Sequence, residues 1–303
     1  MPSKTLFIEL FQPFAQYRNP FTFYYAQTYP LPPKSTIIGM LQNACDDWYG
    51  NRYGMENWWD FKVSVHGGFE SVFWNYQNLI KGDVELGGDG KLWNQNEDQK
   101  QKLPLYGECK TAQRSPVHQQ EMFNGHLYIF IRGEQKLEKL LDTIHNALVS
   151  PRKVLSLGRS EDVVFIREVK EVKPQDTIEI KTDVRLTYPT YIKADGFPIA
   201  NQKFPVYTIP VKVVFRNKTV GDDNALSPVS HKSEITKETQ RDVQFEKVIY
   251  TGFDYTIRLK QNKSKDKVRS PIKCEIYESE EKNVKNDNAE RKRWILFPEA
   301  SFL

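Results

Sequence analysis

A short stretch near the start of the chain places three polar side chains where a helix is expected to begin. Residues 29–41 read YPLPPKSTIIGML. A proline holds the residue before it in an extended conformation, so the helix must begin at or after Lys34, with Ser35 or Thr36 as a natural N-cap. The free amides of the first turn, the helix dipole and the Lys34 ammonium together favour an anion such as a phosphate. The alternative is that Ser35 only caps a core helix, and the residues alone leave both interpretations open.

The segment after the first predicted strand offers another kind of contact. Tyr17 supplies an aromatic ring that could stack on a base, and Arg18 supplies a guanidinium that could bind a phosphate. An ordinary surface loop would contain the same residue types. This segment is therefore a candidate for nucleic-acid contact, with a plain loop as the alternative.

A polar stretch in the middle of the chain carries three further candidate residues. Residues 110–120 read KTAQRSPVHQQ and include Lys110, Arg114 and His118. Apolar side chains are almost absent, so the stretch predicts either the polar edge of a hairpin or a surface that faces RNA. The residues favour neither interpretation over the other.

A glycine-containing loop provides the best local candidate for a contact to an RNA backbone. Residues 150–165 read SPRKVLSLGRSEDVVF. Gly158 would let the chain approach a ligand closely, with Arg159 and Ser160 beside it. The spacing matches neither GxxxxGK[ST] nor GxGxxG, so it does not predict a nucleotide-triphosphate or dinucleotide site.

The elements that position these residues follow from the hydrophobic periodicity. The predicted order is strand, helix, strand, strand, helix, strand, at residues 5–11, 35–50, 61–74, 126–132, 134–148 and 162–172. This is the order of a ferredoxin-like domain, an antiparallel sheet with helices on one face. Residues 75–104 are rich in Asn, Gln, Gly and Lys, and predict an excursion or a mobile hairpin that leaves that domain.

The second half of the chain contains only short strand patterns separated by Pro, Gly and Asn. The predicted fold class is therefore α+β. A ferredoxin-like (RRM-like) domain occupies residues 1–174, with a hairpin insertion around 75–120, and a mostly β region occupies 175–303. A basic block at 258–273 precedes an acidic block at 275–290, which predicts a solvated, self-compensating hairpin or loop.

The composition excludes several classes of protein. With 303 residues, 39% of them hydrophobic and 13% aromatic, the chain can form one large or two ordinary folded domains. No apolar run approaches the roughly 20 residues of a membrane span, and the start lacks the pattern of a signal peptide, which predicts a cytoplasmic protein without a membrane partner. The net charge of +4 does not by itself indicate nucleic acid. The three cysteines are far apart and no cluster has metal-ligand spacing, so neither a metal nor a cofactor is predicted.

Two of these motifs resemble a known family. YPLPPKSTIIGML after a first strand, and LSLGRSED before the last strand of a ferredoxin-like half, resemble the repeat-associated RNA-binding superfamily of CRISPR systems. Over about residues 1–170 the chain is most similar to the CRISPR-associated Cas5 family, and the form of its helix start resembles subtype B. This family caps the five-prime end of the guide RNA (crRNA) in the type I surveillance complex, Cascade.

The resemblance implies a non-catalytic subunit that binds the five-prime handle of the crRNA and has a β-hairpin thumb. It implies contacts with the large subunit and a backbone subunit, and it places target DNA nearby. Lys34, Ser35 and Thr36, and the loop from Gly158 to Ser160, fall on motifs near the RNA-binding region of the family. On this hypothesis Arg159→Ala weakens guide binding and flattens its salt dependence.

Two alternative functions remain open. Members of one subtype of the family cut precursor RNA without a metal, and here only His66 and His118 could serve as acid or base. A scaffold without RNA contact would instead leave Arg18, Lys34, Arg114 and Arg159 on unrelated faces. The clamp interpretation requires these four cations to converge on one surface.

Overall fold

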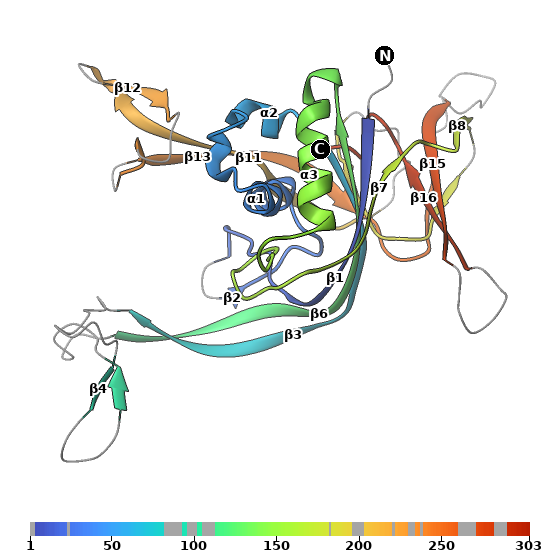
Figure 1. Cartoon of the computed structure of the whole chain (residues 1–303). Helices are drawn as coiled ribbons and strands as arrows, with labels where there is room; N and C mark the ends of the chain where they lie inside the picture. The colour runs from blue at the N-terminus through green and yellow to red at the C-terminus, as the bar shows by residue number, and fades with distance from the viewer. Residues whose placement is uncertain are drawn as a thin grey trace.

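The computed structural model describes most of the chain, and all structural statements below refer to this part. The described residues are 4–22, 25–81, 93–95, 102–104, 113–181, 183–195, 203–219, 222–229, 234–236, 239–259, 271–281 and 290–303. The chain is a mixed α+β protein in which strands predominate (Figure 1).

A central antiparallel sheet organises the first half of the chain. Its order is β3, β6, β1 and β7, and the short β2 adds to β6 in parallel. The bounds are β1 Lys4–Ala15, β2 Tyr25–Ala26, β3 Lys62–Lys81, β6 Gln113–Gly133 and β7 Phe165–Val172. The chain thus follows the predicted succession of strand, helix, strand, strand, helix, strand.

The helices pack on one face of this sheet (Figure 1). The helical elements are α1 Lys34–Ala44, η1 Trp48–Gly50, α2 Met55–Trp59, η2 Gln135–Leu137 and α3 Glu138–Val149. Period-2 alternation in β1 sends Leu6, Ile8 and Leu10 to the helix-covered core, while Phe7 points to the opposite face. We call that opposite side the outer face of the sheet.

The β3–β6 pair continues far beyond the sheet as a projecting hairpin (Figure 1). Its register runs from Lys62↔Arg132 to Lys81↔Gln113. The first of these strands was predicted to end at residue 74, but it continues to Lys81. Residues 113–120, predicted as the polar edge of a hairpin or a surface that faces RNA, belong to the paired strand β6. Inside the predicted insertion the structure also describes the paired strands β4 Trp93–Gln95 and β5 Lys102–Pro104.

Every element that the structure describes after β7 is a strand, as predicted. These are β8 Asp176–Ile180, β9 Val184–Leu186, β10 Tyr191–Lys193, β11 Val206–Thr219, β12 Asp222–Pro228, β13 Gln240–Tyr250, β14 Tyr255–Ile257, β15 Ile272–Glu281 and β16 Glu290–Leu296. They form sheets of order β10-β13-β11-β12, β16-β15-β8 and β14-β9. Most of the two charged blocks, residues 260–270 and 282–289, lies outside the described residues.

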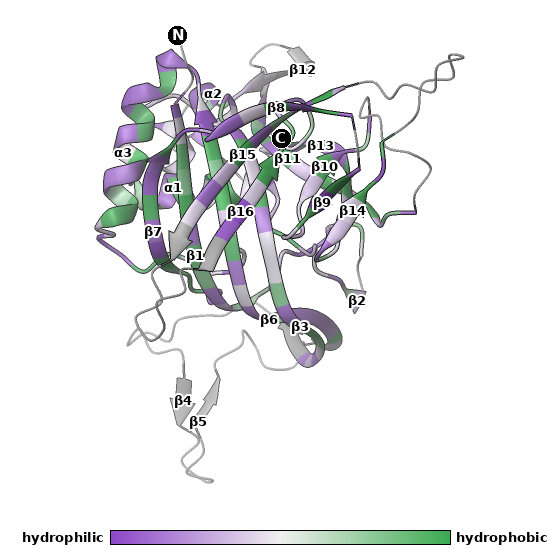
Figure 2. Cartoon of the chain, turned by 90° about the vertical axis from the view of Figure 1, so that its right-hand side faces the viewer, coloured by the Kyte–Doolittle hydropathy of each residue, from purple (hydrophilic) through white to green (hydrophobic). Residues whose placement is uncertain are grey.

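The C-terminal strands cover part of the outer face. Figure 2 shows β15 and β16 in front of β1, β6 and β3. Aromatic side chains fill this contact, with Trp294 5.1 Å from both Phe7 and Tyr128 between ring centroids. On the helix side, Ile209 and Val248 belong to the same core cluster as α1 and β1. The two regions therefore share buried contacts, and the predicted boundary at residue 174 stays a prediction.

Cys45 and Cys274 are buried free thiols, and Cys109 lies outside the described residues. No helix in the described ranges has the length and apolar character needed to cross a membrane. Within the same ranges, no three His, Cys, Asp or Glu side chains are grouped so that they could hold a metal ion.

Candidate nucleic-acid interface

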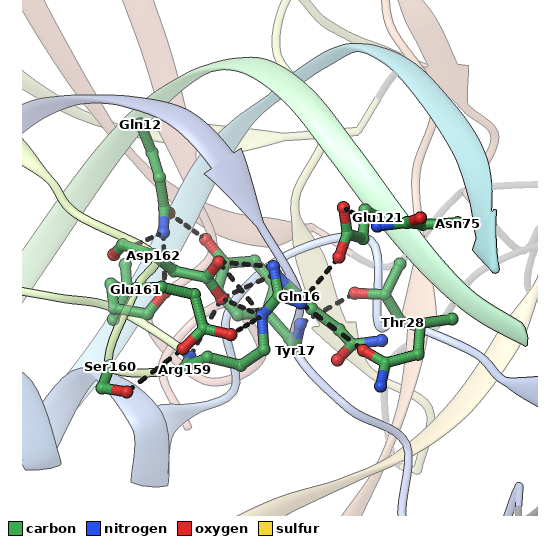
Figure 3. A network of polar contacts seen from close by, with 12 residues as sticks. Gln12, Gln16, Tyr17, Thr28, Asn75, Glu121, Arg159, Ser160, Glu161 and Asp162 are labelled. Atoms are coloured by element: carbon green, nitrogen blue, oxygen red, sulfur yellow. Dashed lines mark hydrogen bonds and ion pairs between the residues drawn. The ribbon is translucent and has the colours of Figure 1, made fainter. Parts of the chain in front are cut away.

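The guanidinium of Arg159 lies between two carboxylates of its own loop and a third one from β6 (Figure 3). Its Nη1 is 2.6 Å from Glu121 Oε1 on β6, its Nη2 is 2.8 Å from Asp162 Oδ1, and its Nε is 3.3 Å from Glu161 Oε1. Ion-paired hydrogen bonds of this kind are about twice as strong as neutral ones. Arg159 therefore fastens the glycine-containing loop to β6. This placement differs from the predicted one, in which the guanidinium faces an RNA phosphate.

Asp162 is the buried centre of the same network. Its Oδ2 accepts the backbone N–H of Gln16 at 3.0 Å and that of Arg159 at 2.9 Å. A buried carboxylate needs such donors because it has lost its hydration. The loop is thereby tied to the end of β1 as well as to β6.

Gly158 and Ser160 also have partners within the chain. Gly158 has φ +114°, and a Cβ there would lie 2.8 Å from both Asp162 Oδ2 and Gln16 O. The glycine is therefore required by the approach of the loop to β1, not by a ligand as the sequence suggested. The exposed Ser160 donates its hydroxyl to Glu161 Oε2 at 3.1 Å.

Tyr17 is a buried member of the network. Its hydroxyl donates to Gln12 Oε1 at 2.5 Å, and Gln12 Nε2 donates to Leu157 O at 2.7 Å. Burial raises the pKa of the Tyr17 hydroxyl well above its ordinary value, so this group stays protonated as a donor. The ring is only 2% exposed. The prediction that it offers a stacking surface for a base does not agree with this position.

The start of α1 also differs from the prediction. Pro33 occupies the N-cap position without a side-chain hydrogen bond, so neither Ser35 nor Thr36 caps the helix, and both are partly buried in its first turn. Lys34 is only 9% exposed, and its Nζ donates to Trp59 O at 2.9 Å. Desolvation, with a contribution from the charge of Lys193, lowers the pKa of Lys34 to about 8. The ammonium points into the protein and not toward an external phosphate.

A group of exposed rings lies where the projecting hairpin leaves the sheet. Tyr25, Trp74 and Tyr76 are 63%, 49% and 58% exposed. Tyr25 stacks on His118 with ring centroids 5.6 Å apart, and Tyr76 meets the same His118 ring edge-on at 5.3 Å. Trp74 contacts Tyr25 edge-on at 6.1 Å. We call these four residues the aromatic platform.

The loop that contains Arg18 continues this surface toward the second half of the chain. Arg18 is exposed and forms a β-bridge with Thr28. In the same loop Phe21 contacts Phe245 of β13, with ring centroids 5.2 Å apart, and both rings are exposed. The loop therefore carries both an exposed cation, Arg18, and an exposed ring, Phe21, that contacts β13.

The remaining predicted residues differ in their burial, and one of them lies outside the described residues. Arg114 lies on β6 opposite Ile80, and Lys110 lies outside the described residues. His66 is buried, with its Nε2 3.1 Å from Ser64 Oγ, and desolvation lowers its pKa to about 3. A neutral, inaccessible ring cannot exchange protons with RNA, so His66 is removed as a candidate acid or base. His118 is exposed within the aromatic platform.

The predicted cations do not all converge on one surface. Arg18 is exposed, Lys34 is buried beside α2, and Arg159 is held by three carboxylates. The platform residues Tyr25, Trp74 and Tyr76 were not predicted. For Trp74 and Tyr76 the signal was the alternation of residues 72, 74 and 76, which was cut short by ending the strand at residue 74.

Exposed aromatic rings on strands with an arginine beside them are a common arrangement of single-stranded nucleic-acid-binding proteins. The sequence matches the family described as "CRISPR-associated protein (Cas_Cas5)" over residues 5–251. The chain therefore belongs to the CRISPR-associated Cas5 family, as its motifs predicted. Among curated proteins, none matches this sequence.

Several solved structures are similar to this chain at low values. One, described as "CRISPR RNA-guided surveillance complex", is 14% identical with a TM-score of 0.44, covering 83% of this chain and 91% of its own. "Crystal structure of Cas protein" is 15% identical with a TM-score of 0.38, covering 88% and 98%. "Crystal structure of a CRISPR protein from Archaeoglobus fulgidus" is 12% identical with a TM-score of 0.32, covering 85% and 99%. At these values the likenesses carry no argument about function.

Proposed function

We propose that this chain is a non-catalytic subunit of a type I CRISPR surveillance complex and binds the five-prime handle of the crRNA. Its partners in this proposal are the crRNA, the large subunit and a backbone subunit, with target DNA nearby. Membership of the Cas5 family supports the complex as its context.

The aromatic platform is the observation that supports RNA binding most directly. Large rings normally move out of water when a protein folds, yet Tyr25, Trp74 and Tyr76 are about half or more exposed. Each presents a surface on which a base can stack regardless of its identity. The nearby Arg18 supplies an exposed cation for a phosphate.

The fold supplies a rigid support for this surface. We infer that β1, β3, β6 and β7 with α1 and α3 form a ferredoxin-like domain, since their antiparallel order β3-β6-β1-β7 agrees with that arrangement. The hairpin that extends from β3 and β6 is the proposed thumb. The network around Asp162 holds the end of β1 and the glycine-containing loop against β6, close to the hairpin base.

The proposal is tested by measuring the affinity of the purified chain for a labelled RNA that contains the repeat, in EDTA. Stacking contributes about 1 to 3 kcal/mol per base, so Trp74→Ala or Tyr76→Ala should weaken binding by about 5- to 150-fold. Phe253→Ala is the matched control because it removes an exposed ring outside the platform. Equal affinities of the platform variants and the control would contradict RNA binding at the platform.

A second candidate function is metal-independent cleavage of precursor crRNA. It is favoured by one observation, the contact of His118 with the two tyrosine rings. In such a reaction His118 would accept the proton of a ribose 2′-hydroxyl while that oxygen attacks the adjacent phosphorus. The bond from phosphorus to the 5′-oxygen would break, and a tyrosine hydroxyl would protonate the leaving oxygen. The products would be a 2′,3′-cyclic phosphate and a 5′-hydroxyl.

The same incubation in EDTA separates the candidates. RNA that is retained intact supports the binding subunit. A discrete cut that disappears in His118→Ala supports the nuclease. RNA that is neither retained nor cut, both by the free chain and in the assembled complex, supports a scaffold without RNA contact.

A further inference from the structure

The outer edge of β7 is unpaired within the described residues. β7 lies at the end of the central sheet, and β1 is its one described partner. Figure 2 shows β7 at the margin of the sheet, between α3 and β1. An edge strand presents a row of backbone N–H and C=O groups that can pair with another extended chain.

An apolar groove of about 790 Å³ follows this edge. It is lined by the end of α3, the loop after it and residues 163–169. Val149 and Val154 line this groove, and their aliphatic side chains are 60% and 74% exposed to water. Exposed aliphatic side chains beside an open strand edge are typical of a surface that is covered in an assembly.

The other side of the same edge is also apolar. Phe165 is 51% exposed and lies 6.2 Å from Phe11 between ring centroids, and the guanidinium of Arg167 lies 5.3 Å from the Phe11 centroid. Further along the outer face β15 covers the sheet, where Lys170 Nζ donates to Ser279 Oγ at 3.1 Å. The described C-terminal strands therefore leave the Phe165 end of β7 open.

The charges of the groove distinguish between possible occupants. Lys153 is paired with Asp46, and Glu168 is paired with Lys170. Arg167 has no ion pair with a carboxylate of the described residues. The groove lining therefore carries one uncompensated positive charge, that of Arg167. An occupant with a carboxylate beside Arg167 would complement it. Aliphatic walls and a single free cation do not suit a polyanionic RNA backbone.

We propose that β7 binds an extended, apolar segment of another protein subunit, which adds a strand to the central sheet. Backbone pairing with β7 would send the side chains of this segment alternately toward Val149 and Val154 and toward Phe165. A carboxylate in the segment would pair with Arg167. A helix would fill only one of the two sides, so the two-sided apolar edge fits an extended segment better. The identity of the partner as a subunit of the surveillance complex rests on the proposed function.

The test compares amide hydrogen exchange of residues 163–172 in the free chain and in the complex assembled with guide RNA and the other subunits. Added backbone hydrogen bonds should slow exchange in β7 by about tenfold or more in the complex. Val149→Asp combined with Val154→Asp should abolish this protection, since carboxylates would enter the apolar groove. Val206→Asp is the control, because Val206 is a valine on β11 that is also more than half exposed, at 52%.

The outcomes that overturn the proposal are specific. Exchange of β7 that is equal in the free chain and the complex overturns it, as does failure of the chain to co-purify with another subunit. Protection by guide RNA alone would identify a nucleic-acid occupant, and concentration-dependent protection of the free chain would identify a second copy. Loss of RNA retention with β7 still protected in the complex would instead contradict the proposed RNA binding and leave this inference standing.

Discussion

The carboxylate of Asp162 accepts the backbone N–H of Gln16 at 3.0 Å, across 146 residues of sequence. This contact joins the glycine-containing loop to the end of β1, directly before the loop that carries Arg18. Arg159 extends the connection to Glu121 on β6. The network therefore fixes the position of the Arg18 loop relative to the hairpin, and the candidate interface depends on it.

Removal of the Arg159 side chain should destabilise the protein. Arg159→Ala leaves Asp162 and Glu121, both buried, without their cation, and breaking a buried pair in this way costs about 3 kcal/mol. Urea unfolding of the variant measures this loss. Arg293→Ala is the control, because the Arg293–Glu278 pair is half-exposed and 3.8 Å long, and its loss should cost less than about 1 kcal/mol. Equal losses in the two variants would contradict the buried network.

Arg18 and Arg159 should affect RNA binding in different ways. Arg18→Ala removes an exposed cation, so the slope of the logarithm of affinity against the logarithm of salt concentration should fall by about 1. Arg159→Ala should weaken binding through misplacement of the loop and leave the slope unchanged, which replaces the flatter dependence expected from the sequence. Titrations at three or more salt concentrations measure both slopes. A reduced slope for Arg159→Ala would show that its guanidinium contacts a phosphate after all.

The order of elements followed from the sequence because periodicity is a local property. Period-2 alternation identified β1 and the later part of β6, and the 3.6-residue pattern identified α1 and α3. The hairpin length was missed because residues 75–81 and 113–120 do not keep a strict alternation of apolar and polar side chains. Hydrophobic periodicity identifies a strand only where such an alternation is present.

The site was less predictable than the fold. Its sequence motifs were correct signs of the family, but the side chains that carry them point inward: Lys34 donates to Trp59 O and Arg159 pairs with carboxylates. Residue type does not reveal whether a cation faces solvent or a carboxylate far away in the sequence. The contact of Tyr25 with His118 depends on parallel pairing of β2 with β6, which no local pattern encodes.

Lys34 should make stability depend on pH in the alkaline range. Its pKa is lowered from 10.5 to about 8 by burial, so between these values the unfolded chain binds more protons than the folded one. The difference in the free energy of unfolding between the unchanged protein and Lys34→Met should therefore rise by about 2 to 3 kcal/mol from pH 7 to pH 10. Urea unfolding of both proteins from pH 7 to 10 measures the difference. A difference that stays constant with pH would contradict a buried ammonium.

Two glycines should respond to alanine in opposite directions. At Gly158 the backbone has φ +114° and a Cβ would approach Gln16 O to 2.8 Å, so Gly158→Ala should lower the free energy of unfolding by about 2 to 3 kcal/mol. At Gly39, in the middle of α1, a Cβ would meet no atom within 4 Å, so Gly39→Ala should raise it by about 0.5 to 1 kcal/mol. Thermal and urea unfolding of the two variants measure both effects.

Since Gly158 holds the loop against β1, only Gly158→Ala should also weaken RNA binding. A tolerated alanine at residue 158 would mean that the loop does not approach β1 as closely as the network requires.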